Sequence, residues 1–335
     1  MAKTITTGSE SQRKFAKVIS SMTGKYSLWQ LWRDVIHCYA CAVSNSVDLQ
    51  HREAREAEYM STINKYDESE RMRIAELGAI MVEGMEEDAQ NGTYRDYLGE
   101  LFMQLELGSN LGGQFFTPYP LCQFMAQSAM NERQYKMELE KQGWISVADV
   151  ACGAGATLIA GMETLRSMGI NYQQNCLFFG QEIDQTTALM CYIQLSLHGC
   201  AGLVRVDDTL RKPFTGNLLF GGDQSENNWY TPMFFSEVWH GRRIARRMDD
   251  ILNSMAPREK QPETAPPAPA VEGAPPKVEG APSKVEGARI EVDETPAAVE
   301  EASASLPAEP EEPKQKRKSK KREEPQPEQL SFFWE

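Results

Sequence analysis

The sequence predicts an α/β protein in which an all-helical N-terminal domain precedes a parallel sheet and a disordered C-terminal tail follows it. Residues 1–107 carry apolar side chains at helical spacing, and residues 108–255 alternate short apolar runs with helical stretches. Fourteen of the eighteen prolines lie after Ala256. The predicted domains are therefore residues 1–107, 108–255 and 256–335.

The helical domain is predicted from apolar side chains that recur every three or four residues. Within residues 1–60 they include Trp29, Trp32, Val35, Ile36 and Tyr39. A charged segment follows, and further helices are predicted over residues 74–90 and 93–107, with Asn91-Gly92 as the break between them.

The pattern changes at Trp144. Residues 145–150 and 176–180 are predicted as short buried strands, each followed by a turn and a helix, and LVRVDDTL (203–210) as a third strand. Strands and helices that alternate at this spacing indicate βαβ units, hence a parallel sheet covered by helices. Ligands of such sheets bind beyond the carboxyl ends of the strands. The glycines and carboxylates discussed below fall at those ends.

Composition excludes several classes of protein. The chain has 35 basic and 48 acidic residues, for a net charge of −13, and no apolar run reaches the ~18–20 residues of a membrane span. Because the N-terminus also lacks the apolar core of a signal peptide, we expect a cytoplasmic protein, near the nucleoid of a bacterium or in a phage or mobile-element context. The seven cysteines are then expected to be reduced thiols.

Cys38 and Cys41 form a C-x-x-C pair inside one predicted helix. No second pair completes a zinc site, and His37 alone does not supply one. Buried helix thiols are therefore favoured over metal or redox use, and no metal centre is predicted.

A glycine turn follows the first predicted strand. Gly153 and Gly155 lie between that strand and a helix, where free N–H groups suit a polar or anionic ligand. Leu158 occupies the place of the third glycine of a dinucleotide fingerprint. Glu182 ends the next strand, where its carboxylate can accept hydrogen bonds from both ribose hydroxyls of an adenosine. Simple turn glycines and a solvated helix-start glutamate are the structural alternatives.

Three segments, in this order, carry a family resemblance that covers roughly residues 90–215. LGGQFFTP (111–118) is similar to a G-[EQ]-[FY]-[FY]-T-P signature, DVACGAGATL (149–158) resembles D-P-A-C-G-[ST]-G, and FGQEID (179–184) looks like a G-Q-E segment. All three motifs are found in DNA adenine-N6 methyltransferases, especially in the modification subunits of type I restriction systems. The sequence is thus identified as resembling that family.

The resemblance implies a Rossmann-like core that uses S-adenosyl-L-methionine. It places Thr117 and Pro118 beside the methionine moiety and Asp208 near the cofactor adenine, with Asp207 as the competing candidate and a helix-start cap as the structural alternative. The complete implied cofactor site is Phe116, Thr117, Pro118, Asp149, Ala151, Cys152, Gly153, Gly155, Glu182 and Asp208.

The family's catalytic tetrapeptide, [DNS]-P-P-[YFW], is absent from the sequence after residue 210. In the family its polar groups accept hydrogen bonds from the adenine amino group and its ring stacks on the flipped base. The catalytic residues are therefore unassigned. Two functions remain open: a DNA adenine methyltransferase with an altered catalytic loop, and a non-catalytic cofactor-binding or scaffold protein of this fold that acts at DNA.

Basic and apolar clusters indicate partners. DNA is the expected partner of basic residues on a helix and in the tail, with a solubilising charge run as the alternative: Arg242, Arg243, Arg246, Arg247, Lys316, Arg317 and Lys318. The terminal segment Gln329, Leu330, Ser331, Phe332 and Phe333 is similar to the Q-L-[SD]-L-F peptide that docks on the bacterial replicative sliding clamp. A subunit that supplies DNA specificity and a chance hydrophobic end are its alternatives.

Overall fold

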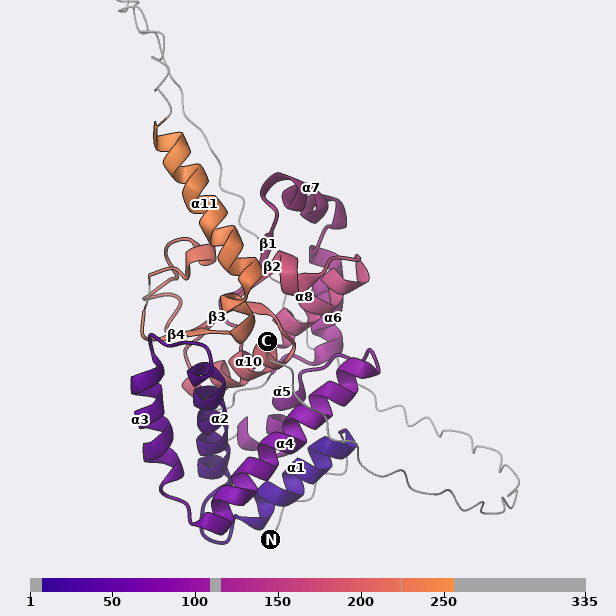
Figure 1. Ribbon diagram of the computed structural model, residues 1–335. Helices are drawn as coiled ribbons and strands as arrows, with labels where there is room; N and C mark the ends of the chain where they lie inside the picture. Colours follow the sequence, from indigo (N-terminus) through magenta and orange to yellow (C-terminus); the bar gives the residue numbers. More distant parts are fainter. Residues whose placement is uncertain (1–7, 109–115, 224, 256–335) are drawn as a thin grey trace, which may run out of the picture. The chain divides into compact units, whose positions relative to one another are not determined.

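In a computed structural model, which describes residues 8–108, 116–223 and 225–255, the centre of the α/β part is a sheet (Figure 1). Its strands within the described residues are β1 (Ile145–Asp149), β2 (Cys176–Glu182), β3 (Ala201–Val206) and β4 (Asn228–Tyr230), in the spatial order β1-β2-β3-β4. β1, β2 and β3 are parallel, as the sequence predicts.

The prediction of a purely parallel sheet is wrong, because β4 pairs antiparallel to β3, with Leu203 opposite Tyr230. A parallel partner needs a crossover, usually an α-helix. The only helix described between β3 and β4 is the 3₁₀ turn η2 (Leu218–Phe220), so the chain returns in the opposite direction. The sheet is therefore mixed.

Alternate residues of β2 contribute to two different cores. Phe178 packs in the larger cluster with the helices that connect the strands, α8 (Ala156–Ser167) and α10 (Gln185–Leu197). Leu177 and Phe179 face the other way, into a cluster with Trp239 at the start of α11 (Glu237–Met255). Every residue of β2 except Glu182 is buried, because both faces of this strand are covered.

The N-terminal segment is helical, as predicted, throughout its described elements: α1 (Glu10–Ser21), α2 (Leu28–Asn45), α3 (Arg52–Ile63), α4 (Glu68–Gln90) and α5 (Tyr97–Gln104). The predicted continuous stretch over residues 1–60 is divided, because α1 ends before a turn and Ser27 caps a new helix by accepting from Gln30 N. Asp67 and Glu70 form a capping box that starts α4 six residues before the predicted Ile74. The charged segment after residue 50 is therefore helical too.

Three further helices lie in this part of the chain: α6 (Tyr119–Ala129), α7 (Glu132–Gln142), which contacts β1, and the short α9 (Tyr172–Asn175), which contacts β2. α6 packs along α8. A second 3₁₀ turn, η3 (Pro232–Phe235), joins β4 to α11.

The helical layer packs directly on the α/β part. α2 lies along α10, and the described residues of both parts fall in one compact unit (Figure 1). Arg55 of α3 donates to the backbone oxygen of Asn228 in β4 at 2.7 Å. The predicted domain boundary at residue 107 is therefore crossed by buried polar contacts, and the predicted tail, 256–335, lies outside the described residues.

All seven cysteines are free and buried, including Cys38 and Cys41 on α2. Burial raises the pKa of both of these thiols to about 12. None of the helices in the described ranges combines the length and the apolar character that crossing a membrane requires.

Candidate functional site

A pocket lies where β1 and β2 end, and residues from four separate segments form its wall. Its volume is about 150 Å³. The lining residues are Asp96, Phe116, Thr117, Cys122, Asp149, Ala151, Cys152, Gly153, Ala154, Ala156, Thr157 and Glu182. Seven of the ten residues of the predicted cofactor site are among them: Phe116, Thr117, Asp149, Ala151, Cys152, Gly153 and Glu182. The other three, Pro118, Gly155 and Asp208, are not among the lining residues.

The loop after β1 is held in shape by Asp149 and by two glycines. One carboxylate oxygen of Asp149 accepts from Ala151 N at 2.9 Å, and the other accepts from the Thr157 hydroxyl. Gly155 begins α8 with a φ of +100°, and a Cβ there would lie 2.8 Å from the Cys191 sulfur. Only glycine therefore fits this turn without displacing α10.

Glu182 closes the pocket from β2. Its Oε2 accepts from Gly153 N at 3.1 Å and its Oε1 accepts from Asp184 N at 3.0 Å. The predicted acidic residue and the predicted glycine loop, 29 positions apart, are therefore joined by a hydrogen bond.

Phe116 and Thr117 form the wall opposite the glycine loop. The Phe116 ring packs on Phe102 with centroids 5.2 Å apart, and a Cβ on Gly153 would lie 3.4 Å from it. Pro118 caps α6 and is not among the lining residues. Residues 111–115 of the predicted signature lie outside the described residues.

Asp96, Cys122 and Gln194 belong to this region but were missed by the sequence analysis. Asp96 lines the pocket and accepts from Gly99 N at 2.9 Å and from Gln194 Nε2 at 2.7 Å. Gln194 also donates to Ala154 O at 2.8 Å, which ties α10 to the glycine loop. Complete burial raises the pKa of Asp96 to about 6 by desolvation.

The residues that form this pocket lie within the region in which the chain matches a known family. The family described as N-6 DNA Methylase matches residues 95–260. The chain belongs to the N6-adenine DNA methylase family. The family resemblance predicted from the sequence is thereby confirmed.

Two curated relatives of this methylase family member are type I restriction enzyme methylase subunits. The MjaIX methylase subunit of Methanocaldococcus jannaschii is 26% identical over 151 residues, which is 45% of this chain and 24% of the relative. The MpnII methylase subunit of Mycoplasma pneumoniae is 29% identical over 87 residues, 26% of this chain and 14% of the relative. The matches thus span at most about a quarter of these relatives, and no solved structure matches the chain.

The two aspartates after β3 lie outside the lining of the pocket. Asp208 accepts from Leu210 N at 2.9 Å, so it caps its own turn. Asp207 pairs with Arg205 at 3.4 Å and Lys212 at 3.4 Å. A role for either near a cofactor adenine stays a prediction.

The segment after β3 is where a methylase of this family would carry its catalytic tetrapeptide. In this chain, side chains of that segment pack against the sheet and the helices. The Phe214 ring packs on Phe179 with centroids 4.5 Å apart, and Trp229 lies buried beneath the Arg55 guanidinium at 4.0 Å. Thr231 is fully buried and donates to Cys200 O at 2.7 Å. The two aromatic side chains, Phe214 and Trp229, are therefore used in packing within the chain.

The arginines predicted to contact DNA lie on α11, and each has a partner within the chain. Arg242 donates to Asn175 at 3.0 Å, Arg243 donates to Phe234 O, and Arg246 pairs with Asp250 at 3.3 Å. Arg247 lies over the Phe220 ring at 5.3 Å. DNA contact by these residues stays a prediction, and the basic and apolar segments predicted in the tail lie outside the described residues.

Proposed function

We propose that the chain binds S-adenosylmethionine in the pocket beyond β1 and β2 and takes part in adenine-N6 methylation of DNA. The observation that carries the proposal is the hydrogen bond from Gly153 N to Glu182, which joins two motifs of the family at one site. Carboxyl ends of parallel strands are the usual ligand-binding edge of an open α/β sheet. We infer that β1, β2 and β3 belong to a Rossmann-like core.

The residues present fit the cofactor. Glu182 offers a carboxylate for the ribose hydroxyls, the loop of residues 149–155 offers N–H groups at the start of α8, and Phe116 offers an aromatic wall. The pocket of about 150 Å³ is smaller than the ~300–1,000 Å³ of most ligand sites, so the ligand would extend beyond the described lining. When bound, S-adenosylmethionine supplies an electrophilic methyl group.

The residues of this chain would bind and orient the cofactor, but they do not supply a recognisable acceptor for the adenine amino group. Such an acceptor must lie within hydrogen-bond distance of the reacting nitrogen. Because the segment after β3 is used in packing and the tetrapeptide is absent from the sequence, we propose that the acceptor comes from a segment of a second polypeptide.

The free edge of β1 is the place where that segment fits. β1 is an edge strand, and no described strand pairs with its outer side. In a doubly wound sheet the first strand is central, with a second set of strands on its other side, and the ligand binds where the two halves meet. The described sheet therefore corresponds to one half, and we propose that a strand with a following catalytic loop adds to β1.

A non-catalytic cofactor-binding or scaffold role at DNA is the second candidate, favoured by the use of the post-β3 aromatics in the core. The two candidates share the cofactor site and differ in methyl transfer. For either candidate function, we propose two protein partners: a subunit that supplies DNA specificity and the replicative sliding clamp. Titration of a peptide of residues 323–335 against the host clamp tests the latter, and absence of binding at tens of micromolar would contradict it.

The proposal is tested by calorimetric titration of the folded chain with S-adenosylmethionine. Glu182→Gln should weaken binding about tenfold or more, because charge-assisted hydrogen bonds are lost. The matched control is Glu140→Gln on the exposed side of α7, which should bind as the original chain does. No binding at millimolar cofactor by well-folded protein would overturn the cofactor site.

Methyl transfer to DNA is measured separately with labelled cofactor. We expect transfer by this chain alone to be weak or undetectable, because the acceptor is missing. Robust adenine-N6 transfer by the chain alone would contradict the proposed need for a second polypeptide segment.

A further inference from the structure

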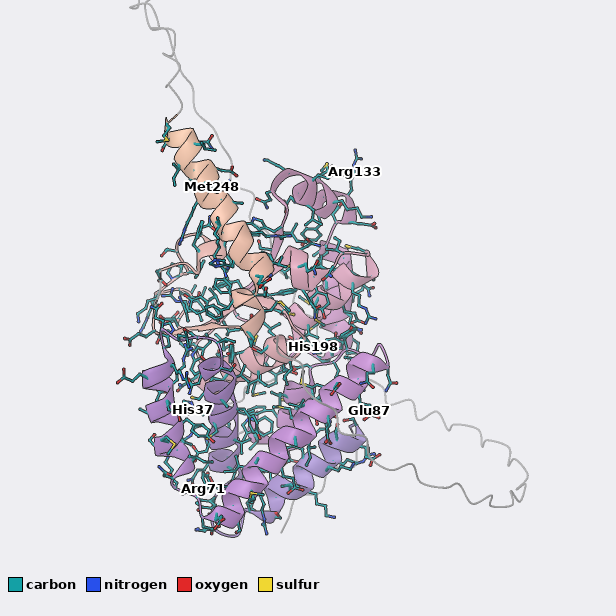
Figure 2. The ribbon with its side chains drawn as sticks, viewed as in Figure 1. His37, Arg71, Glu87, Arg133, His198 and Met248 are labelled. Carbon is teal, nitrogen blue, oxygen red and sulfur yellow. The ribbon has the colours of Figure 1, made fainter. Side chains whose placement is uncertain are left out.

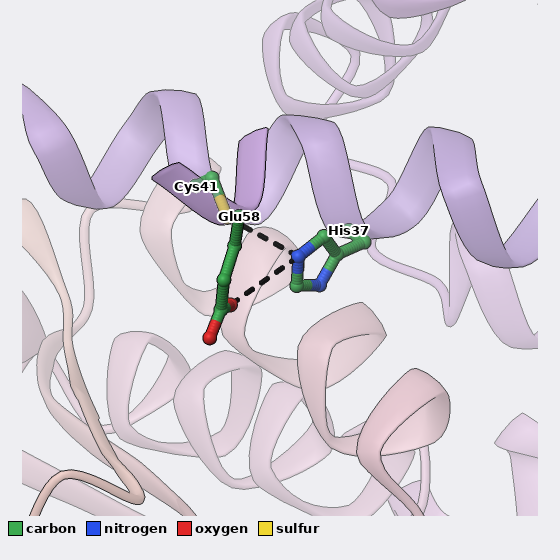
Figure 3. Close-up of side chains that lie close together, drawn as sticks. All are labelled: His37, Cys41 and Glu58. Carbon is green, nitrogen blue, oxygen red and sulfur yellow. Dashed lines mark hydrogen bonds and ion pairs between the residues drawn. The ribbon is translucent and has the colours of Figure 1, made fainter. Parts of the chain in front are cut away.

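A cluster of three potential metal ligands lies in the helical layer, away from the cofactor pocket. His37 and Cys41 are four residues apart on α2, so they share one face of that helix, and Glu58 reaches them from α3 (Figure 3). Their ligating atoms all lie within 4.8 Å of one another.

Two of the three distances between the ligand atoms match a tetrahedral site, and the third, between Cys41 and Glu58, lies within 4.8 Å. Cys41 Sγ lies 3.6 Å from His37 Nε2, and His37 Nε2 lies 3.4 Å from Glu58 Oε2. Zinc bonds of about 2.0–2.3 Å at tetrahedral angles place neighbouring ligand atoms about 3.3–3.7 Å apart. We propose that His37, Cys41 and Glu58 bind one Zn²⁺ ion that joins α2 to α3.

The chemistry of the three groups suits this ion. His37, Cys41 and Glu58 offer one nitrogen, one sulfur and one oxygen ligand, which are the three ligand types that zinc takes in proteins. The thiol proton of Cys41 leaves to solvent as the zinc–sulfur bond forms, and the thiolate and carboxylate together balance the charge of the ion. The Glu58 side chain is 53% exposed, so water can reach the fourth position.

The site has a structural consequence for the sheet. Two residues at the start of α3 cover β4. The N-cap residue His51 stacks on Tyr230, and Arg55 donates a hydrogen bond to Asn228 O. An ion that fixes α3 against α2 would therefore also hold the cover of β4 in place.

The alternative is a metal-free contact in which His37 pairs with Glu58 and hydrogen-bonds Cys41. Cobalt substitution distinguishes the two. The full chain, purified with reductant and stripped with chelator, is titrated with Co²⁺ and followed by absorption. One equivalent should give the tetrahedral d–d bands and a thiolate charge-transfer band, and Zn²⁺ should displace both.

Cys38→Ser is the matched control, because Cys38 is a buried thiol on the same helix outside the cluster. It should keep the charge-transfer band, whereas Cys41→Ser should lose it. Glu58→Gln, at an exposed position, should fold normally and weaken metal binding about tenfold or more. Absence of stoichiometric binding, or a thiolate band that persists in Cys41→Ser, would overturn the site.

Discussion

The two edges of the sheet differ in how they are covered. At one edge all three residues of β4 are buried, under His51 and Arg55 of α3. At the other edge β1 is only partly buried, with Ser146 and Ala148 exposed. Exposed strand edges invite pairing with another chain.

The difference indicates that one edge of the sheet serves the stability of the fold, whereas the other is free for a contact with another segment. The covered edge is the result of contacts within the chain, and the segment that leads to it is used in packing. The open edge lies beside the glycine loop after β1, where we propose that a catalytic segment adds. An uncovered edge of β1 beside the proposed cofactor site is what our proposal of an added strand requires.

The largest expected effect concerns the covered edge. Arg55 is 4% exposed and donates to Asp48 at 2.8 Å and to Asn228 O at 2.7 Å. Arg55→Ala leaves the buried Asp48 carboxylate without this partner, so we expect a loss of about 3–5 kcal/mol in the free energy of unfolding. Urea denaturation measures it.

Arg52→Ala is the control for that variant, because Arg52 is exposed on the same helix. Its effect should stay within about 0.5 kcal/mol. Equal stability of Arg55→Ala and Arg52→Ala would show that the cover of β4 is not held by this arginine.

Sequence reasoning found the parts of the fold that have local signals. The glycine turn after β1 and the carboxylate at the end of β2 were predicted because each follows an apolar strand and precedes a helix. β4 was missed because three residues carry no periodic pattern. Asp96 was missed because its partner Gln194 is 98 positions away, and such a contact leaves no local trace. Glu58 was missed as a potential metal ligand because it lies on α3, whereas His37 and Cys41 lie on α2.

The next effect concerns the pH dependence of the free energy of unfolding, to which two buried groups contribute with opposite sign. Asp96, in the pocket at the open edge, has a pKa raised to about 6 by desolvation, so its contribution to stability is full at low pH and is lost as pH rises through 6. His198, near the helical layer in Figure 2, has a pKa lowered to about 4 by desolvation, so its contribution is full above ~6.5 and is lost as pH falls toward 4.

Between pH 4 and 6 the two groups therefore oppose each other. Relative to the original chain, Asp96→Asn should make stability rise more steeply with pH, and His198→Gln should make it fall more steeply. Each change is up to about 3 kcal/mol across the window, at ~1.4 kcal/mol per pKa unit. Thermal unfolding at several pH values measures both, and identical slopes in all three proteins would contradict the assignment.

A comparable effect, measured as the difference between a variant and its control, concerns the glycine loop at the open edge. Gly155 and Gly143 both have positive φ, but a Cβ at Gly155 would meet Cys191 at 2.8 Å whereas one at Gly143 meets nothing within 4 Å. Alanine at either position bears the left-handed strain, of about 1–2 kcal/mol. Gly155→Ala should cost a further ~1–3 kcal/mol from the contact and should alone weaken cofactor binding. Equal losses in both variants would argue against close packing of the loop on α10.

The smallest effect concerns the open edge itself. Ser146 is exposed on β1, so Ser146→Lys should change the free energy of unfolding of the isolated chain by no more than about 0.5 kcal/mol. The same lysine would oppose the addition of a strand, since lysines on edge strands hinder pairing with other chains. Urea denaturation of the variant therefore tests whether the sheet face that carries Ser146 next to this edge is free in the isolated chain. A loss of several kcal/mol would mean that Ser146 is covered there, and the proposed site for a catalytic strand would then be occupied by this chain.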